Sequence, residues 1–486
     1  MSRCFSKSSF AFFLALGFAL ASGSHGQTLY SVVDLGDLPG GSASRAFAIN
    51  DNGEICGTST VSNSTRGFFW SESAGMIDIG SPGSGFQIVA QDINNGGVIA
   101  GYGDSVNETV GFVWDPVNGS QNVGTLSGSN RTFLRGINDA GVATGRSNGE
   151  GITWDTVNGL QTTGHLGSGA ADNQAINELG QIAGASFDPS FNLHAYTWDS
   201  QNGATDIGAL IGKNSVSYAN DINNFGVVAG SFLNPTSESV SYVWDPATGL
   251  DLPGAVPGAP GDSQANAIND SGQVVGAGGS VAFIYKPGTG VRDLNNLLDS
   301  SGDLWTLSTA LDINERGQIV GIGDAPDGTV SAFLLNPANT FADTIQVTRG
   351  TVRAGSLNDL IASDDNDLSV SRNPVDVQPT ISIEFCTQSF ISSPDDLTFT
   401  LESSVFARAN ISQEIELFDF SSQQWEQVDM RNASRFGDLT VTVDTSGNVS
   451  RFVEAGSRAM KARVTFNSAQ PRARFSANID RVEWNF

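Results

Sequence analysis

The stretch Ile49-Asn50-Asp51-Asn52-Gly53-Glu54-Ile55-Cys56-Gly57 decides the fold, because its pattern returns six more times along the chain. In every copy an Ile precedes an Asn, and Gly follows that Asn by three and by seven places. The seven asparagines are Asn50, Asn94, Asn138, Asn177, Asn223, Asn269 and Asn314, separated by 44, 44, 39, 46, 46 and 45 residues. A β-type repeat with a period of about forty to forty-five residues is typical of a propeller blade. The sequence therefore predicts a β-propeller of seven blades.

Each repeat contains four segments that fit strands. The first ends in Ile-Asn, the second is apolar and closes on Gly, and the third is aromatic, as in Phe68-Phe69-Trp70. The fourth is a short Asp-Leu-Gly-like segment such as Asp78-Ile79-Gly80, reached through turns such as Asp115-Pro116-Val117-Asn118-Gly119. Pro presets φ and Gly accepts positive φ, which favours a hairpin there. Five tryptophans recur in the third segment, and we interpret them as core between blades rather than as a sugar-stacking surface: Trp70, Trp114, Trp154, Trp198 and Trp244.

The repeated Asn-x-x-Gly has two readings. An Asn side chain can bond the backbone two residues on, and a Gly three places later can turn left-handed, which predicts a tight structural turn. The alternative is that the side-chain oxygens line the propeller face and bind Ca²⁺, although metal loops carry several acids at fixed offsets. We favour the structural turn. Cys56, which aligns with small residues such as Ala100 and Val275, is expected to be a small buried hydrophobe.

A count of the fourth segments predicts how the ring closes. They begin near Asp34, Asp78, Asn122, Thr163, Asp206, Asp251 and Asp293. The first of these precedes the first Ile-Asn, whereas none follows the last aromatic strand at Phe333. We therefore expect Ser31–Gly36 to pair with Ser331–Leu335, so that the start of the propeller completes its last blade and removes an open edge.

These units resemble the HAF repeats of secreted bacterial proteins, in the order Asp-Leu-Gly, Ala-Ile-Asn-Asp-x-Gly, Val-Val-Gly and Ala-Phe-x-Trp. The copy from Asp293 to Leu335 resembles the terminal variant of that family, and the resemblance spans about Leu29 to Pro337. It implies a propeller-like domain outside the cytoplasm. It implies no particular activity.

Composition and the first residues indicate export. Arg3 and Lys7 precede an apolar run from Phe10 to Ala21 and the small residues Ala21-Ser22-Gly23-Ser24, which is the pattern of a signal peptide. The apolar run is short for a membrane span, and no longer one follows. We expect a signal peptide over 1–26, the propeller over 27–338, and no integral membrane segment after cleavage. The net charge of −27 disfavours nucleic acid as a partner.

The last third lacks the repeat and alternates apolar with polar residues, as in Thr380-Ile381-Ser382-Ile383-Glu384-Phe385. Such alternation predicts an antiparallel β-sandwich of roughly eight to ten strands over 339–486. The segment Asp364-Asp365-Asn366-Asp367 is its densest acidic cluster. Asp364, Asp365 and Asp367 are candidate Ca²⁺ ligands, and a solvated acidic loop is the simpler reading, since the Gly and terminal Glu of an EF-hand are missing. We also consider that Trp425 could stack on sugar from an exposed loop.

The residue inventory gives no sign of an enzyme. His165 and His194 have no paired His or Cys nearby for zinc, and no serine-nucleophile motif precedes a helix. No catalytic residues, cofactor-binding residues or organic cofactor are predicted, with Ca²⁺ the one possible ion. We expect a secreted, extracellular or periplasmic binding or scaffolding protein that is not an enzyme, with an unknown protein or polysaccharide as its partner. The alternative is a carbohydrate-active enzyme or glycan-binding protein that uses the propeller face, in which two carboxylates would share a cleft.

Overall fold

The computed structural model describes residues 30–485 apart from 82–86, 105–106, 168, 213–214, 288, 338, 342–343, 355–367, 373–379, 389–396, 436–437, 446–448, 455–458 and 471–472. Tyr30–Asn336 form one compact unit, and Pro337–Phe486 belong to a second. Both units are built from β-strands, and the described residues include a single short α-helix, α1 (Gly208–Ile211). The fold is a seven-bladed β-propeller followed by an antiparallel β-sandwich, as the sequence predicts.

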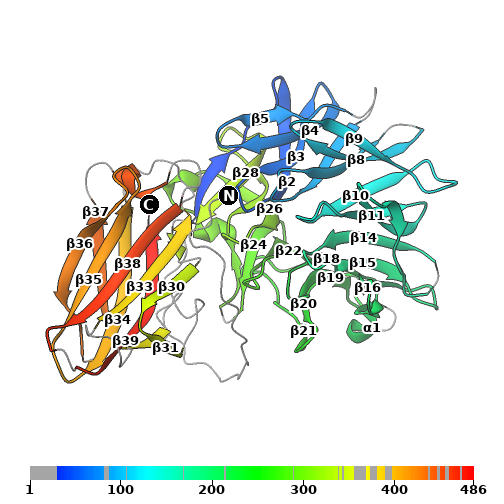
Figure 1. Ribbon diagram of the computed structural model, residues 1–486. Coiled ribbons are helices and arrows are strands. Elements are labelled where there is room, and N and C mark those ends of the chain that lie inside the picture. The colour runs from blue at the N-terminus through cyan, green and yellow to red at the C-terminus, as the bar shows by residue number, and fades with distance from the viewer. Residues whose placement is uncertain are drawn as a thin grey trace. The chain divides into compact units, whose positions relative to one another are not determined.

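Seven antiparallel sheets of four strands each make the propeller (Figure 1). Blade 1 consists of β2 (Gly41–Ile49), β3 (Ile55–Val61), β4 (Ser64–Ser71) and β5 (Gly75–Asp78), and blade 2 of β6 (Gln87–Ile93), β7 (Ile99–Asp104), β8 (Thr109–Asp115) and β9 (Gly119–Gly124). Blade 3 consists of β10 (Thr132–Ile137), β11 (Ala143–Ser147), β12 (Glu150–Asp155) and β13 (Gly159–Thr162), and blade 4 of β14 (Ala171–Ile176), β15 (Ile182–Phe187), β16 (Leu193–Asp199) and β17 (Gly203–Asp206).

The later blades repeat this order. Blade 5 consists of β18 (Ser217–Ile222), β19 (Val228–Leu233), β20 (Ser239–Asp245) and β21 (Gly249–Asp251), and blade 6 of β22 (Ser263–Ile268), β23 (Val274–Gly278), β24 (Val281–Lys286) and β25 (Gly290–Asp293). Blade 7 has β26 (Thr306–Ile313), β27 (Ile319–Asp324) and β28 (Val330–Pro337). Two 3₁₀ turns, Leu294–Leu297 and Ser300–Gly302, connect blade 6 to blade 7.

The fourth strand of blade 7 comes from the start of the described chain. The sheet order is β1-β28-β27-β26, with β1 (Tyr30–Asp34) beside β28. Leu35 N donates to Ala332 O over 3.0 Å, and Ser331 Oγ donates to Asp34 Oδ1 over 2.5 Å. This is the pairing that the count of fourth segments predicts, and it gives blade 7 the same four strands as the other six blades.

Steric constraints explain why Gly occupies both repeated positions. The Gly three places after the Asn has φ between 71° and 78° in all seven blades, a region that side chains rarely adopt. The Gly seven places after the Asn lies against a carbonyl of the first strand, and a Cβ there would stand only 1.9–2.4 Å from that oxygen. Any side chain at Gly57 or its equivalents would therefore force the first two strands apart.

A β-bulge brings that carbonyl close, and it recurs in the first strand of every blade. The register between the first and second strands shifts by one residue just before the Ile-Asn, for example between Ala46 and Ala48. A bulge re-aims its extra residue. In blade 5 the bulged Asn220 donates to Ala265 O of blade 6, and in blade 6 Asn266 donates to Ala310 O of blade 7, both over 2.8 Å.

The apolar core of the propeller lies between successive blades. Phe69 and Cys56 of blade 1 belong to the same buried cluster as Ile88 and Trp114 of blade 2. Trp70, Trp154 and Trp244 likewise belong to clusters that join neighbouring blades. The interpretation of the repeated tryptophans as core is confirmed for Trp70 and Trp114, which are buried, and Cys56 is fully buried as expected. Trp154 and Trp244 are partly buried against their clusters, and Trp198 is also partly buried.

The sandwich has two sheets. One contains β31 (Thr351–Ala354), β32 (Leu368–Ser371), β39 (Phe475–Asn485), β34 (Leu397–Ala407) and β37 (Leu439–Thr445), with β29 (Asn339–Phe341) paired to β39. The other runs β30 (Thr344–Arg349), β33 (Thr380–Gln388), β38 (Ala459–Ser468), β35 (Ile411–Asp419) and β36 (Gln424–Asn432). Their facing sides supply one buried core, in which the rings of Phe399 and Trp484 lie 5.1 Å apart. These eleven strands exceed the predicted eight to ten because β29 and β31 are too short to be seen in the residue pattern.

Candidate functional site

The repeated asparagine links each blade to the next. In all seven copies its Oδ1 accepts from the backbone NH four residues on, at 2.9–3.0 Å, which closes the turn within its own blade. Its Nδ2 donates to the carbonyl of the equivalent asparagine in the next blade, at 2.9–3.1 Å. The last of these bonds runs from Asn314 to Asn50 and closes a circle, which we name the asparagine ring. The structural-turn prediction is confirmed, because each Asn oxygen already accepts from its own turn.

The residue after each asparagine forms a second closed circle, the acceptor ring. Its members are Asp51, Asn95, Asp139, Glu178, Asn224, Asp270 and Glu315. The side chain of each accepts a hydrogen bond from the backbone NH of the member one blade earlier, at 2.7–3.0 Å. Five carboxylates and two amides are thus held in fixed positions around the propeller axis. The sequence showed that Asp, Asn or Glu stands here but not that its partner lies one blade away.

Burial and the neighbouring charges raise the pKa of two carboxyl groups in the acceptor ring. Desolvation raises the pKa of Glu315 to about 8, and the charges of Asp270 and Asp51 add to the effect. The pKa of Glu178 is also raised, by desolvation and then by the charges of Asp139 and Asp51. The carboxylates of the ring that stay ionised give this end of the propeller a negative potential, which attracts cations.

Three half-buried aspartates, each one residue before the Ile-Asn, support the asparagine ring. Asp92 accepts from its own Ile93 N over 2.8 Å and from Ile137 N of the next blade over 2.7 Å. Asp221 and Asp312 do the same for Ile222 with Ile268 and for Ile313 with Ile49, all over 2.8 Å. These three aspartates therefore accept hydrogen bonds from six of the seven isoleucine NH groups. Each aspartate bonds two neighbouring blades, so three of them cover six blades, and blade 4 with Ile176 is the seventh. Burial raises the pKa of Asp92 and of Asp221 to about 6, although the hydrogen bonds from these NH groups lower it.

The end of the propeller that carries the acceptor ring also carries the turns between third and fourth strands. A Cβ on Gly226 in the first turn of blade 5 would contact Pro246 in the later turn of that blade. Gly272 and Pro287 of blade 6 are related in the same way. We call this end the turn face; its centre comprises residues 50–53, 94–97, 138–141, 177–180, 223–226, 269–272 and 314–317.

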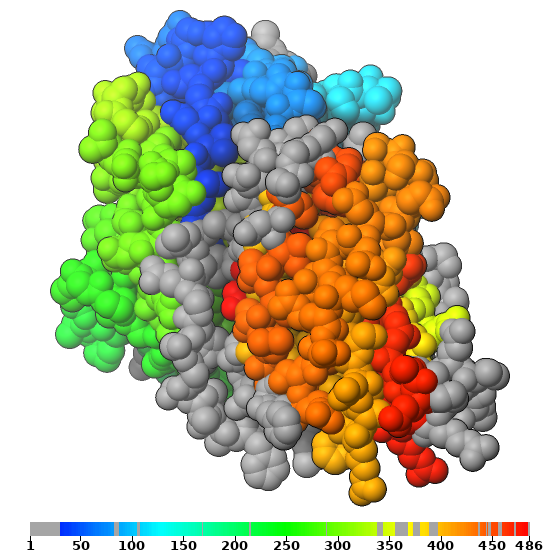
Figure 2. All heavy atoms as spheres, turned by 90° about the vertical axis from the view of Figure 1, so that its left-hand side faces the viewer, coloured from blue at the N-terminus to red at the C-terminus, as the bar shows by residue number. Residues whose placement is uncertain are grey.

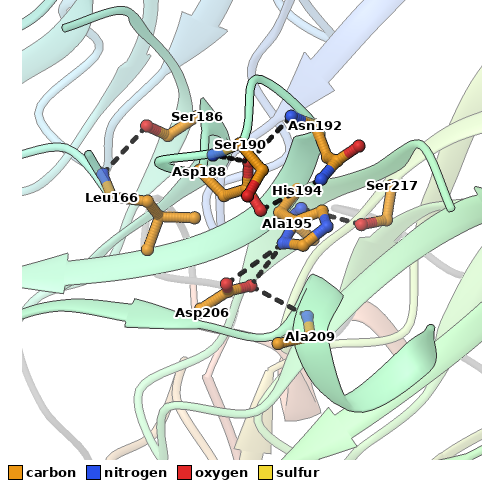
Figure 3. Close-up of polar contacts among 10 residues, drawn as sticks. All are labelled: Leu166, Ser186, Asp188, Ser190, Asn192, His194, Ala195, Asp206, Ala209 and Ser217. Atoms are coloured by element: carbon orange, nitrogen blue, oxygen red, sulfur yellow. Dashed lines mark hydrogen bonds and ion pairs between the residues drawn. The ribbon is translucent and has the colours of Figure 1, made fainter. Parts of the chain in front are cut away.

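His194 and Asp206 form an acid–base pair in blade 4 (Figure 3). His194 Nδ1 lies 2.9 and 3.0 Å from the two carboxylate oxygens of Asp206, and Ala209 N donates to Asp206 Oδ1 over 2.9 Å at the start of α1. The nearby hydroxyl of Ser217 accepts from Ala195 N over 2.9 Å. His194 is 1% exposed and Ser217 is fully buried, so neither can reach a substrate, and the pair instead fixes α1 against β16.

The predicted histidine and acidic sites do not converge. His165 is exposed on the connection between blades 3 and 4, away from the buried strand position of His194. Asp364, Asp365 and Asp367 lie outside the described residues. Within the described ranges, no group of three or more His, Cys, Asp or Glu side chains is placed to hold a metal ion.

Trp425 lies on strand β36 rather than on a loop, so that expectation was wrong. Its ring lies 5.1 Å from that of Phe418, and the Arg463 guanidinium stacks 3.9 Å above it. Glu384 in turn holds Arg463 at 2.6 Å. This part of the sandwich, in orange, faces the viewer in Figure 2. Because a cation of the same sheet covers one face of the indole, the residue is less open to a sugar than the sequence suggested.

Comparisons with known proteins identify no family and only distant structural likenesses. No family model matches the chain, and no curated protein matches it either. Virginiamycin B lyase from Staphylococcus aureus is similar over 63% of this chain and 99% of its own, at 9% identity and a TM-score of 0.40. TolB from Acinetobacter baumannii is similar over 60% and 64%, at 12% identity and a TM-score of 0.36. A carbohydrate-binding module, TmCBM61 in complex with β-1,4-galactotriose, is similar over 29% and 86%, at 8% identity and a TM-score of 0.20. At these values none of the likenesses bears on activity or ligand.

The part of the chain that the structure describes holds no helix of the length and hydropathy that a membrane crossing requires.

Proposed function

We propose that this chain is an exported, non-enzymatic binding protein that presents the turn face of its propeller to a ligand. The observation that carries the proposal is the acceptor ring, in which one side chain from every blade is fixed by the backbone of its neighbour. Acceptors held in place before binding lose little conformational entropy when a ligand arrives. The signal-peptide pattern and the resemblance to HAF repeats support export.

The test is a binding and thermal-shift screen of the full chain against soluble polysaccharides and cationic peptides, with Ca²⁺ and with EDTA. A ligand that binds the native state should raise the unfolding midpoint. The double variant Glu178→Gln/Glu315→Gln keeps an acceptor oxygen for Asp139 N and Asp270 N but replaces two carboxylates with neutral amides. It should weaken binding of that ligand most at about pH 9, above the Glu315 pKa of about 8, where that carboxylate is ionised. Glu238→Gln, an exposed change in the second-to-third-strand turn of blade 5 at the other end, is the matched control.

Two outcomes would overturn the proposal. A ligand whose affinity is unchanged in the turn-face variant would place binding elsewhere, and conversion of a bound polysaccharide to product would favour an enzyme. A midpoint that rises with Ca²⁺ and falls with EDTA would instead support the prediction of a structural calcium site.

Glycan recognition by the sandwich is the second candidate. The specific observation is the exposed-side aromatic group of Phe418, Phe420 and Trp425, whose rings lie 5.0–5.1 Å apart in successive pairs. A sugar could stack on such rings if Arg463 moved from Trp425 and if Lys461, whose Nζ lies 5.4 and 5.7 Å from the ring centroids of Phe418 and Phe420, moved as well. Trp425→Ala should then abolish binding of a polysaccharide found in the screen. The turn-face variants should bind that polysaccharide as tightly as the unchanged chain does.

A further inference from the structure

Two large apolar side chains stand exposed in consecutive turns of the turn face. The residues at the second turn position are Asn52, Gly96, Ala140, Leu179, Phe225, Ser271 and Arg316. Leu179 is 72% exposed and Phe225 is 70% exposed, in blades 4 and 5. The two turns are neighbours in space, because Asn177 Nδ2 donates to Asn223 O over 2.9 Å. We name Leu179 and Phe225 the apolar sector.

The fold does not require apolar side chains at these positions. The backbone NH groups of Leu179 and Phe225 donate to Asn177 Oδ1 and Asn223 Oδ1 over 3.0 Å, and small or polar residues make the same turn in the other blades. Exposure of two neighbouring large apolar groups is unfavourable in water. Neighbouring exposed apolar groups bordered by polar ones mark interaction surfaces.

The surroundings of the apolar sector define the charge of its partner. Glu178 immediately precedes Leu179, and the ring places Asp139 and Asp270 on the flanking blades. Across the seven turns five carboxyl groups stand against one guanidinium, that of Arg316, and four of them outnumber it even when Glu315 carries a proton. A segment that covers Leu179 and Phe225 therefore enters a negative potential, which favours positive charge and disfavours acidic glycans and anionic membranes.

We infer that the apolar sector docks a positively charged amphipathic segment of a partner protein, with an apolar side chain over Leu179 and Phe225 and Lys or Arg toward the acceptor ring. This rests on the proposed function, because it names the class of ligand that the turn face takes. The apolar contact supplies affinity, and the carboxylates supply orientation and a preference for cations.

The experiment uses the full chain and three synthetic peptides of equal length, one of Lys and Leu, one of Lys and Ser, and one of Glu and Leu. The Lys–Leu peptide should bind, and raised salt should weaken it. Leu179→Ser/Phe225→Ser should reduce its affinity by about tenfold to a hundredfold, as expected for two apolar contacts. Val117→Ser/Val157→Ser changes two valines that are each 88% exposed on outer turns of the same face, and it should have no effect.

Equal binding of the Lys–Leu and Lys–Ser peptides, or equal affinity of the two double variants, would overturn the inference. Failure of the Lys–Leu peptide to bind would do the same. If a polysaccharide then bound and lost affinity in Glu178→Gln/Glu315→Gln, the proposed function would stand while the cationic partner would be wrong. If neither class depended on the turn face, both would fail.

Discussion

The junction between blades 1 and 2 and the junction between blades 3 and 4 solve the same packing problem with different chemistry. The first is apolar, with Cys56, Phe69 and Phe112 in one buried cluster. The second is polar, because Asn173 stands where blade 2 has Ala90. Asn173 Nδ2 donates to Thr144 Oγ1 over 3.0 Å and to Thr163 Oγ1 over 3.2 Å, and Tyr196 donates to its Oδ1.

Salt bridges reinforce the polar junction at its edge. Asp172 lies 3.1 Å from Arg135 and 3.2 Å from Arg146, and all three side chains are partly exposed. Ion pairs of this kind contribute little to stability on average. The difference between the junctions teaches that the repeat fixes the backbone of each blade while the contact between blades is free to be apolar or hydrogen-bonded, provided that every buried polar group has a partner.

The largest expected loss of stability comes from Phe112 of the apolar junction, and it is compared with Tyr196, which occupies the equivalent third-strand position of the polar junction. Phe112→Ala should lower the free energy of unfolding by about 3–5 kcal/mol, because it empties a buried ring site. Tyr196→Phe removes only the hydroxyl and leaves Asn173 Oδ1 without that donor, at a cost of about 1–2 kcal/mol. Denaturant unfolding measures both. Equal losses would show that the two junctions do not differ in what stabilises them.

Asn173→Ala should cost about 2–3 kcal/mol, because Tyr196, Thr144 and Thr163 would lose a buried partner together. The control is Ala90→Ser, which places a small polar side chain at the same position of the apolar junction. The midpoint of thermal unfolding measures each change. A neutral Asn173→Ala would mean that the polar network is dispensable and that alanine suffices there, as in other blades.

A smaller effect should appear in the pH dependence of stability. Asp92 keeps its proton to about pH 6 in the folded chain, whereas it loses it near pH 4 when unfolded. The folded state therefore binds the proton more tightly, so this group's contribution to stability is greatest below about pH 4 and falls by about 2 kcal/mol as pH rises to 6. Asp92→Ala should make the decline from pH 4 to 6 shallower than in the unchanged chain. Parallel pH profiles for the two proteins would contradict the raised pKa.

The sequence predicted the blades, the closing strand and the burial of Trp70 and Trp114, because each of these leaves a periodic pattern. It did not predict the bulges, since a shift of one residue in the first strand is invisible in a pattern of apolar residues. Nor did it predict the acceptor ring or the bridging role of Asp92, Asp221 and Asp312. Those partners lie one blade away, about a full repeat along the chain, so local residue types could not identify them.

The candidate site was predicted less well than the fold. Trp425 was placed on an exposed loop from its residue type alone, although it lies at the start of β36. Leu179 and Phe225 were visible only as variable positions inside a conserved spacing pattern. Their exposure became apparent only from the structure of the turn. The residue one place after the Asn belongs to the acceptor ring, whereas the residue two places after it is exposed in blades 4 and 5.

The most direct test of the account compares two neighbouring asparagines of blade 5. Asn223→Asp removes the Nδ2 donor to Asn269 O and places a carboxylate against that carbonyl, so the free energy of unfolding should fall by about 1–3 kcal/mol. Asn224→Asp keeps the acceptor for Glu178 N but replaces the Nδ2 donor to Asp270 Oδ2 with a second carboxylate at this partly exposed position, so the free energy of unfolding should fall by less than about 1 kcal/mol. Unfolding of the two variants in denaturant measures the difference. Equal losses, or a larger loss for Asn224→Asp, would contradict the claim that the repeated asparagine closes the ring while the residue after it serves the face.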